Sequence, residues 1–141
     1  MDTARTALIE HIEPAAAELG LGNVAPYADE IERLSKSPGA LTSRMPLALV
    51  IYLEGQLYGP HAMHVLVITR TAVPDRVRDG SDALALAERL AKWLEANYTF
   101  RAASGERFNI LDSSTGGITV RMRKLSTSYT IADVGFVVGQ S

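Results

Sequence analysis

Hydrophobic positions follow one another without interruption over residues 47–53 (LALVIYL). A strand that is apolar at every position is typical of burial on both faces. A second apolar run covers residues 63–68 (MHVLVI), and the turn residues Gly59 and Pro60 precede it. The pattern predicts one strand over 47–53 and another over 62–71, joined as a β-hairpin.

Apolar residues then recur at helical spacing over residues 81–98. They share one face of the expected helix: Ala83, Ala87, Leu86, Leu90, Trp93 and Leu94. Alanine, leucine, glutamate, arginine and lysine dominate the segment, so helix propensity agrees with the pattern. Ser81 or Asp82 is expected to cap the helix, and residues 73–80 (VPDRVRDG) are predicted to form a polar loop.

The N-terminal residues 3–19 also show one apolar stripe at helical spacing. Pro14 lies inside this segment, where it removes a backbone hydrogen bond, so the helix either kinks there or consists of two shorter pieces. A short strand over 23–27 and a short helix over 28–36 are expected next.

Two strands are expected near the end of the chain. Residues 118–125 alternate between apolar and polar side chains, and residues 129–138 form the last expected strand. The two are predicted to pair antiparallel. A short apolar patch at 108–111 is a further candidate for an edge strand.

These elements predict a single α+β domain over residues 1–141. We expect a mixed or antiparallel sheet of about four to five strands packed against two main helices, in the order α-(β)-α-β-β-α-β-β. Two helices cover one face of such a sheet more naturally than both. The other face needs loops, the short helix or a second subunit, and we favour a second subunit.

Composition agrees with a soluble domain that has a real core. The chain has 141 residues, 47% of them hydrophobic and 21% charged, with a net charge of −2 and no cysteine. The missing cysteine excludes disulfides and thiolate metal sites. No apolar run approaches the roughly 20 residues of a transmembrane helix, and no secretory signal is evident at the N-terminus, so we expect a cytoplasmic protein.

Few residues suggest catalysis or metal binding. His61 and His64 are three residues apart, but a zinc site needs three or four ligands and no acidic residue stands at ligand spacing. Asp29, Glu30 and Glu32 could perform acid–base chemistry or bind magnesium, although such a cluster on a short helix is usually a solvated face.

Basic residues are the more informative candidates. Arg121, Arg123 and Lys124 lie close together on an expected strand, and Arg76 and Arg78 precede the long helix. Arginine is enriched at protein interfaces and at anion-binding sites. Nucleic-acid binding would favour a wider basic field with aromatic residues among it. We therefore interpret these five residues as interaction residues, with plain solubility as the alternative.

The chain resembles a family of small Mu-like bacteriophage tail proteins of the tail-terminator type. The resemblance covers roughly residues 5–138 and rests on four segments: VAPYADEIERL, PLALVIYLEG, HAMHVLVITRT and ALALAERLAKWLEANY. It implies a compact α/β protein that assembles into a homo-oligomeric ring, typically a hexamer. The family offers no catalytic residues to carry over.

By this resemblance the protein caps the tail tube at its head-proximal end and stops tail polymerisation. It would act in the bacterial cytoplasm during assembly and then reside in the virion tail, in contact with tail-tube or sheath proteins and with the head connector. Loops at 70–80 and 101–117 could supply those contacts. No enzymatic activity, cofactor, metal, nucleic-acid specificity or membrane association is expected.

Two other functional classes remain open from the sequence. One is a small metal-dependent hydrolase or nuclease that uses Asp29, Glu30 or His64. The other is a monomeric module that binds a ligand or a protein.

Overall fold

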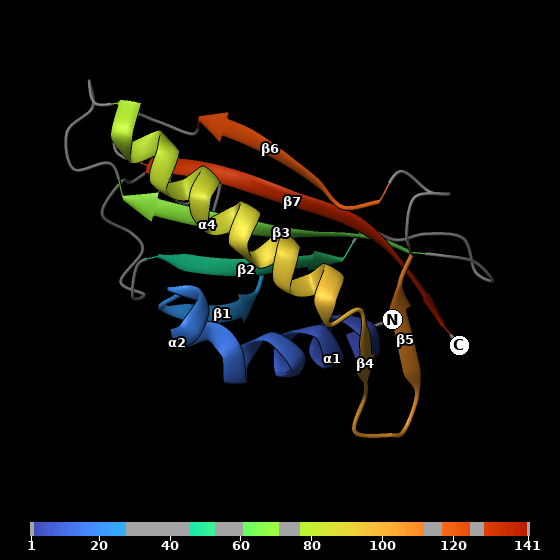
Figure 1. The fold of residues 1–141 in the computed structure, drawn as a ribbon. Helices are drawn as coiled ribbons and strands as arrows, with labels where there is room; N and C mark the ends of the chain where they lie inside the picture. The colour runs from blue at the N-terminus through green and yellow to red at the C-terminus, as the bar shows by residue number, and fades with distance from the viewer. Residues whose placement is uncertain are drawn as a thin grey trace.

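The structure, a computed structural model, describes residues 2–27, 46–52, 61–70, 77–111, 117–124 and 129–140. In this part of the chain seven strands form one curled, mixed sheet, with helices on one face (Figure 1). In chain order the strands are β1 (Asn23–Pro26), β2 (Leu47–Tyr52), β3 (His61–Arg70), β4 (Thr99–Arg101), β5 (Arg107–Ile110), β6 (Thr119–Lys124) and β7 (Tyr129–Gln140).

The predicted fold class is therefore wrong. A sheet of about four to five strands packed on two main helices was expected, whereas the molecule is rich in strands and its sheet has seven. Two of the strands, β4 and β5, form a hairpin between the long helix and β6. With three and four residues, they are too short to show a clear period of two, so the sequence pattern understated the sheet.

The strand β7 organises the sheet. The order is β1-β2-β3-β7-β5-β4, and β6 also pairs with β7. One edge of β7 carries β3 along ten residue pairs; the other edge carries β6 opposite residues 130–135 and β5 opposite residues 138–140. Only the β1–β2 pair is parallel among these ladders. The antiparallel β2–β3 and β6–β7 pairs confirm two sequence predictions.

The N-terminal helix is divided at Pro14. The helix α1 (Asp2–Ile12) ends there, a 3-10 turn η1 (Glu13–Ala15) contains the proline, and a short helix α2 (Ala16–Leu19) follows. This confirms the second of the two alternatives for Pro14, because a proline at the start of a new turn needs no N–H donor. Gly20 then ends α2 with a φ of 82°, a left-handed conformation that glycine adopts without strain.

The long helix α4 (Val77–Ala96) begins earlier than expected. The caps predicted at Ser81 or Asp82 and the loop predicted over 73–80 are wrong from Val77 onward. The first six residues (VRDGSD) contain one apolar residue and a glycine, so the hydrophobic stripe that reveals the helix begins only at Ala83. The helix predicted over 28–36 lies outside the described residues.

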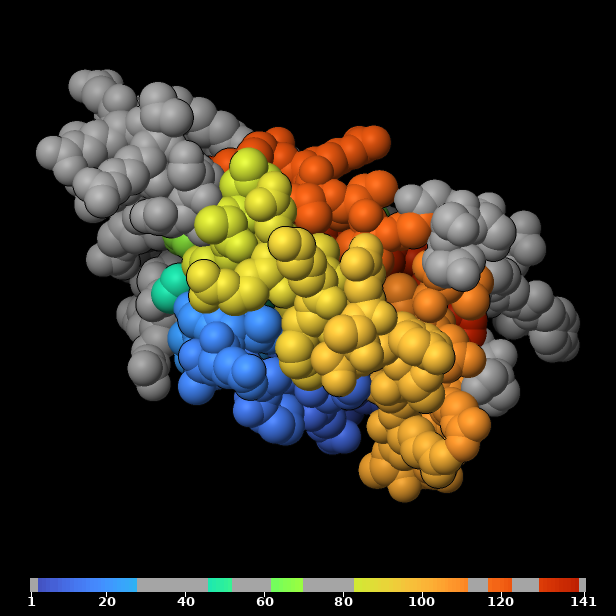
Figure 2. Space-filling view, in the orientation of Figure 1, coloured from blue at the N-terminus to red at the C-terminus, as the bar shows by residue number. Residues whose placement is uncertain are grey.

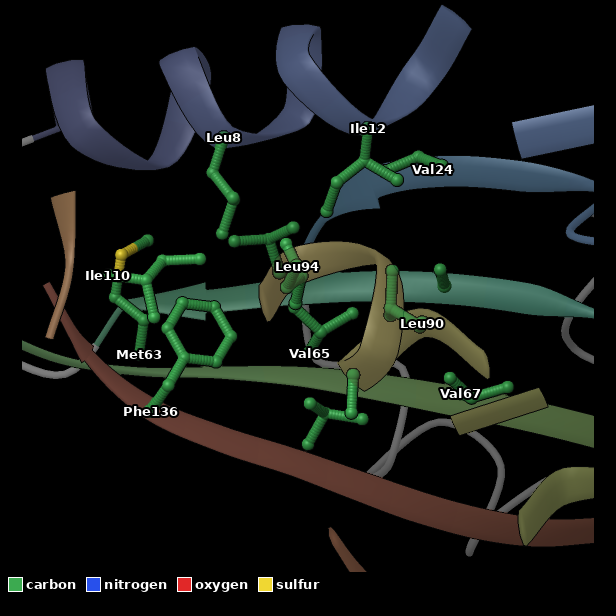
Figure 3. Packing of buried hydrophobic residues seen from close by; sticks show 14 of the residues in the cluster. Leu8, Ile12, Val24, Met63, Val65, Val67, Leu90, Leu94, Ile110 and Phe136 are labelled. Atoms are coloured by element: carbon green, nitrogen blue, oxygen red, sulfur yellow. The ribbon is translucent and has the colours of Figure 1, made fainter. Parts of the chain in front are cut away.

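The main core lies between the helices and one face of the sheet (Figure 3). In that close-up, side chains from α1, α4 and the strands meet in one layer: Leu8, Ile12, Val24, Met63, Val65, Val67, Leu90, Leu94, Ile110 and Phe136. The buried stripe of α4 was predicted correctly at Ala83, Ala87, Leu90 and Leu94, whereas Leu86 and Trp93 are only partly buried. Alternation along β3 and β7 places every second residue in this core.

A second, smaller apolar cluster lies on the opposite face of the sheet. Its five buried members are between 0% and 1% exposed: Leu47, Leu49, Leu66, Ile68 and Ile131. Residues 47–50 of the strand predicted over 47–53 are thus buried on both faces, as expected, whereas Ile51 is only partly buried. These five residues are already buried in the single chain, so the burial of Leu47, Leu49, Leu66, Ile68 and Ile131 requires no second subunit.

The helix α1 connects the two ends of the curled sheet. It contacts β1 and β2 at one end of the strand order and β4 at the other (Figure 1). His11 fixes the second contact, because its Nε2 lies 2.8 Å from the carbonyl oxygen of Asn97 and its ring is 5.6 Å from the ring of Phe100. Both ends of the main strand order are therefore held against one helix, while β6 lies off that order.

Candidate interaction surface

The strand β6 is the outermost strand on its side of the sheet. Among the described strands it pairs with β7 alone, so its other edge is unpaired within that part of the chain (Figure 1). Its sequence, TVRMRK, holds three basic residues and no acidic one. Arg121 is exposed, and Met122 is 41% exposed. Charged side chains on an edge strand disfavour pairing with another strand, and a partner that neutralises the charge would reduce this penalty.

A histidine and an aspartate pair beside β6, on the sheet face opposite the helices. Nδ1 of His64 on β3 lies 2.8 Å from Oδ1 of Asp133 on β7. The aspartate side chain is 7% exposed and the histidine side chain is 32% exposed. An ionised carboxylate only accepts hydrogen bonds, so Nδ1 of a neutral His64 donates and Nε2 carries the lone pair.

Gly135 provides the space for the imidazole ring. It lies directly opposite His64 across the β3–β7 ladder. A Cβ at this position would lie 3.2 Å from Nδ1 of His64 and 3.2 Å from Oγ1 of Thr119. The hydroxyl of Thr119 in turn donates to the Gly135 carbonyl oxygen at 3.3 Å. Both neighbours of Gly135 are thus held by hydrogen bonds, so a side chain there would have to displace one of them.

Arg121 lies directly across the β6–β7 ladder from Asp133. Residues opposite each other in an antiparallel pair share one face, with Cβ atoms about 4.5–5.5 Å apart, and opposite charges there stabilise the pair. Asp133 therefore has His64 as a hydrogen-bond partner on one side and Arg121 as its cross-strand neighbour on the other. The carboxylate orients the imidazole and offsets part of the positive charge of β6.

Chemically, the His64–Asp133 pair holds one oriented imidazole at a half-exposed position. Such a nitrogen can accept a proton or bind a metal, but zinc requires two or three further ligands. Within the described residues no group of three or more His, Cys, Asp or Glu side chains could hold a metal ion. Positions 61 and 64 are three apart in one strand, and such positions belong to opposite faces of a sheet.

The predicted interaction residues divide into two groups. Arg121, Arg123 and Lys124 all lie on β6, and Arg121 and Arg123 share one face because they are two residues apart. Arg78 lies in the first turn of α4 and not in a loop. Arg76 lies outside the described residues, as do Asp29, Glu30 and Glu32.

Sequence reasoning placed His64 on a strand but missed its partner. His64 and Asp133 are 69 residues apart, and no local pattern connects them. The signal that could have found the pair is Asp133 itself, since it is a charged residue in the strongly apolar run IADVGFVV. A buried charge requires a partner, and the neighbouring strand supplies it.

One open depression of about 310 Å³ lies between α1 and the turn that joins β4 to β5. Its lining is mostly small and polar: Thr3, Thr6, Ala7, Glu10, Ala102, Ala103 and Ser104. Glu10 is the one ionisable side chain in this lining. A single carboxylate gives no acid–base pair, so the depression offers less chemistry than the surface around His64.

Comparison with known proteins adds information on the fold alone. No family model matches the sequence, and no curated protein matches it. A solved structure matches at a TM-score of 0.54 with 11% sequence identity, over 99% of this chain and 94% of that chain. At this identity the match shows that the two chains share an overall fold. Among the described helices none has the length and apolarity needed to cross a membrane.

Proposed function

We propose that this protein is a structural subunit that works by assembling with copies of itself, as a ring that ends a phage-type tail tube. The single observation that carries the proposal is β6, an outermost strand with an unpaired edge, an exposed arginine and an exposed methionine. The resemblance to Mu-like tail proteins supplies the biological setting, with tail-tube or sheath proteins and the head connector as further partners.

The unlike ends of the molecule favour a ring over a two-fold dimer. A ring requires a head-to-tail interface in which two different surfaces meet and the rotation closes. On one side the molecule presents β6, and on the other it presents α1 and α2 beside β1 (Figure 2). Since these two surfaces differ in both secondary structure and charge, contact between them repeats from one subunit to the next.

The direct test is the mass of the purified protein in solution. Light scattering coupled to size exclusion, with native mass spectrometry for subunit number, should show a closed oligomer of defined size over a wide concentration range. Electron micrographs of the same fraction should show rings. Adding purified tail tubes should place density at one tube end, because a terminator binds where polymerisation stops.

A strictly monomeric protein at high concentration would contradict the proposal and favour a monomeric binding module. Co-purification of a stoichiometric divalent metal, with hydrolytic activity that is lost in a His64→Ala variant, would instead favour the enzyme. Each result distinguishes one of the alternatives that the sequence leaves open.

A further inference from the structure

The exposed side of the N-terminal helices is acidic. Of the exposed residues between positions 3 and 20, three are glutamates, Glu10, Glu13 and Glu18, and none is a lysine or an arginine. They recur along α1, η1 and α2, so they share one outer face, which we call the acidic face. None of the three makes an ion pair within the described part of the chain.

The basic strand β6 lies at the opposite side of the molecule. In the strand order, β2, β3 and β7 separate β6 from β1, the strand beside α1 (Figure 1). Within the described residues no ion pair joins the acidic face to β6, so each surface keeps its charge.

An exposed apolar side chain lies on β6, and another lies near the C-terminal end of α1. Within the described residues the exposed large hydrophobic side chains are Met122, at 41%, and Tyr98, at 56%. Met122 lies on β6. Tyr98 follows Asn97, whose carbonyl oxygen lies 2.8 Å from Nε2 of His11, so Tyr98 lies beside α1. A stable interface combines an apolar centre with complementary charge around it, and the two surfaces together hold both components.

We infer that β6 of one subunit docks against the acidic face of a second copy of this chain, and that this contact is the repeating interface of the assembly. The inference rests on the proposed function, which it deepens by naming the two surfaces that meet. Asp133 offsets one of the three cations of β6, so a net positive charge remains to be neutralised by Glu10, Glu13 and Glu18 of the neighbour.

The test is charge reversal on each surface, followed by reversal of both in one chain. The first variant carries Arg123→Glu and Lys124→Glu; Arg121 is kept because it lies across from Asp133. The second carries Glu13→Lys and Glu18→Lys, at positions that are exposed in the single chain. In each variant alone, like charges would meet across the interface. The protein concentration at which half of the subunits are assembled should then rise by roughly tenfold or more.

The chain that carries all four substitutions should assemble as wild type does, because the attraction is restored with its sign exchanged. Mixing the two separate variants should also restore assembly, as rings in which they alternate. The matched control, Lys92→Glu with Arg101→Glu, reverses two exposed cations away from β6 and should assemble normally. Thermal unfolding of each isolated variant establishes that the monomer is folded.

Raising the ionic strength from about 0.01 M to about 1 M shortens the Debye length from about 30 Å to about 3 Å, and should weaken wild-type assembly. Assembly of the Arg123→Glu, Lys124→Glu variant at the wild-type concentration would overturn the inference and leave the proposed function standing. Failure of the four-substitution chain to reassemble, while folded, would also overturn it. A monomeric wild-type protein would overturn the proposed function itself.

Discussion

At the scale of single residues, Gly135 is constrained by its neighbours across both ladders of β7. Its backbone φ is not in the left-handed region, so glycine is not required there for backbone reasons. Glycine is favoured there because a Cβ would lie 3.2 Å from both the His64 ring and the Thr119 hydroxyl, which is closer than an ordinary van der Waals contact. The geometry of the His64–Asp133 pair is therefore expected to depend on the absence of a side chain at position 135.

A substitution cycle tests this dependence. We expect Gly135→Ala to lower the free energy of unfolding by about 1–3 kcal/mol, the usual cost of inserting a methyl group into a packed site. In a His64→Ala background the same substitution should cost clearly less, since the ring it meets is gone. Chemical denaturation of the four proteins gives the coupling energy.

Gly139→Ala is the matched control on the same strand. A Cβ there would meet only the side chain of Leu111, at 3.2 Å, and Leu111 is partly exposed and able to move. Equal costs for Gly135→Ala in both backgrounds would mean that His64 is not what restricts the position.

At the scale of elements, secondary structure was predicted best where one hydrophobic periodicity continued over many residues. The buried stripe of α4, the strands β2 and β3, and the β6–β7 pair all emerged from hydrophobic spacing. Prediction failed where an element was short or polar. The strand β4 has only three residues, and the first turn of α4 lacks an apolar stripe. Neither segment therefore shows a hydrophobic periodicity from which its secondary structure could be predicted.

The strand β3 permits a sharp test of the smaller apolar cluster. Leu66 is 1% exposed, and Leu66→Asp should abolish cooperative folding, because an unpaired charge would be buried on the face opposite the helices. Ala62, four residues earlier on the same face, is exposed, so Ala62→Asp should leave the melting temperature nearly unchanged. Circular dichroism and thermal melting of the two variants make the comparison.

Leu66→Asp as a folded, soluble monomer would mean that this cluster is not closed within one chain. That result would revive the expectation of a second subunit over this face. A large loss of stability in Ala62→Asp would instead contradict the exposure of Ala62 in the single chain.

At the scale of the whole molecule, the candidate site was only half predictable. The sequence located the basic residues of β6 and their alternation, and an interface was the favoured interpretation. It could not locate the acidic face as their counterpart, because Glu10, Glu13 and Glu18 look like an ordinary solvated helix surface until the topology sets them at the opposite side of the sheet. The positions of basic and acidic residues relative to each other in space depend on the fold, so no single segment of the sequence reveals them.

Hydrogen exchange should reveal both the sheet order and the interface. Amides of β3 should exchange most slowly, since β2 and β7 flank that strand on both sides, whereas those of the short hairpin strand β4 should exchange fast. On assembly, protection should increase in β6 and in residues 10–18 more than in β3. Mass spectrometry on monomeric and assembled fractions measures the change, and protection confined to other segments would contradict the assigned surfaces.

The position of β7 in the sheet also has a consequence for synthesis. The strands β3 and β7 pair although they are far apart in sequence; His64 and Asp133, for example, are separated by 69 positions. The hydrophobic strands β2 and β3 are therefore synthesised long before β7, the strand that pairs with β3. Distant pairing of this kind slows folding and leaves nascent strands open to aggregation. We therefore expect the unfinished half-sheet to benefit from a chaperone that binds exposed strands during translation.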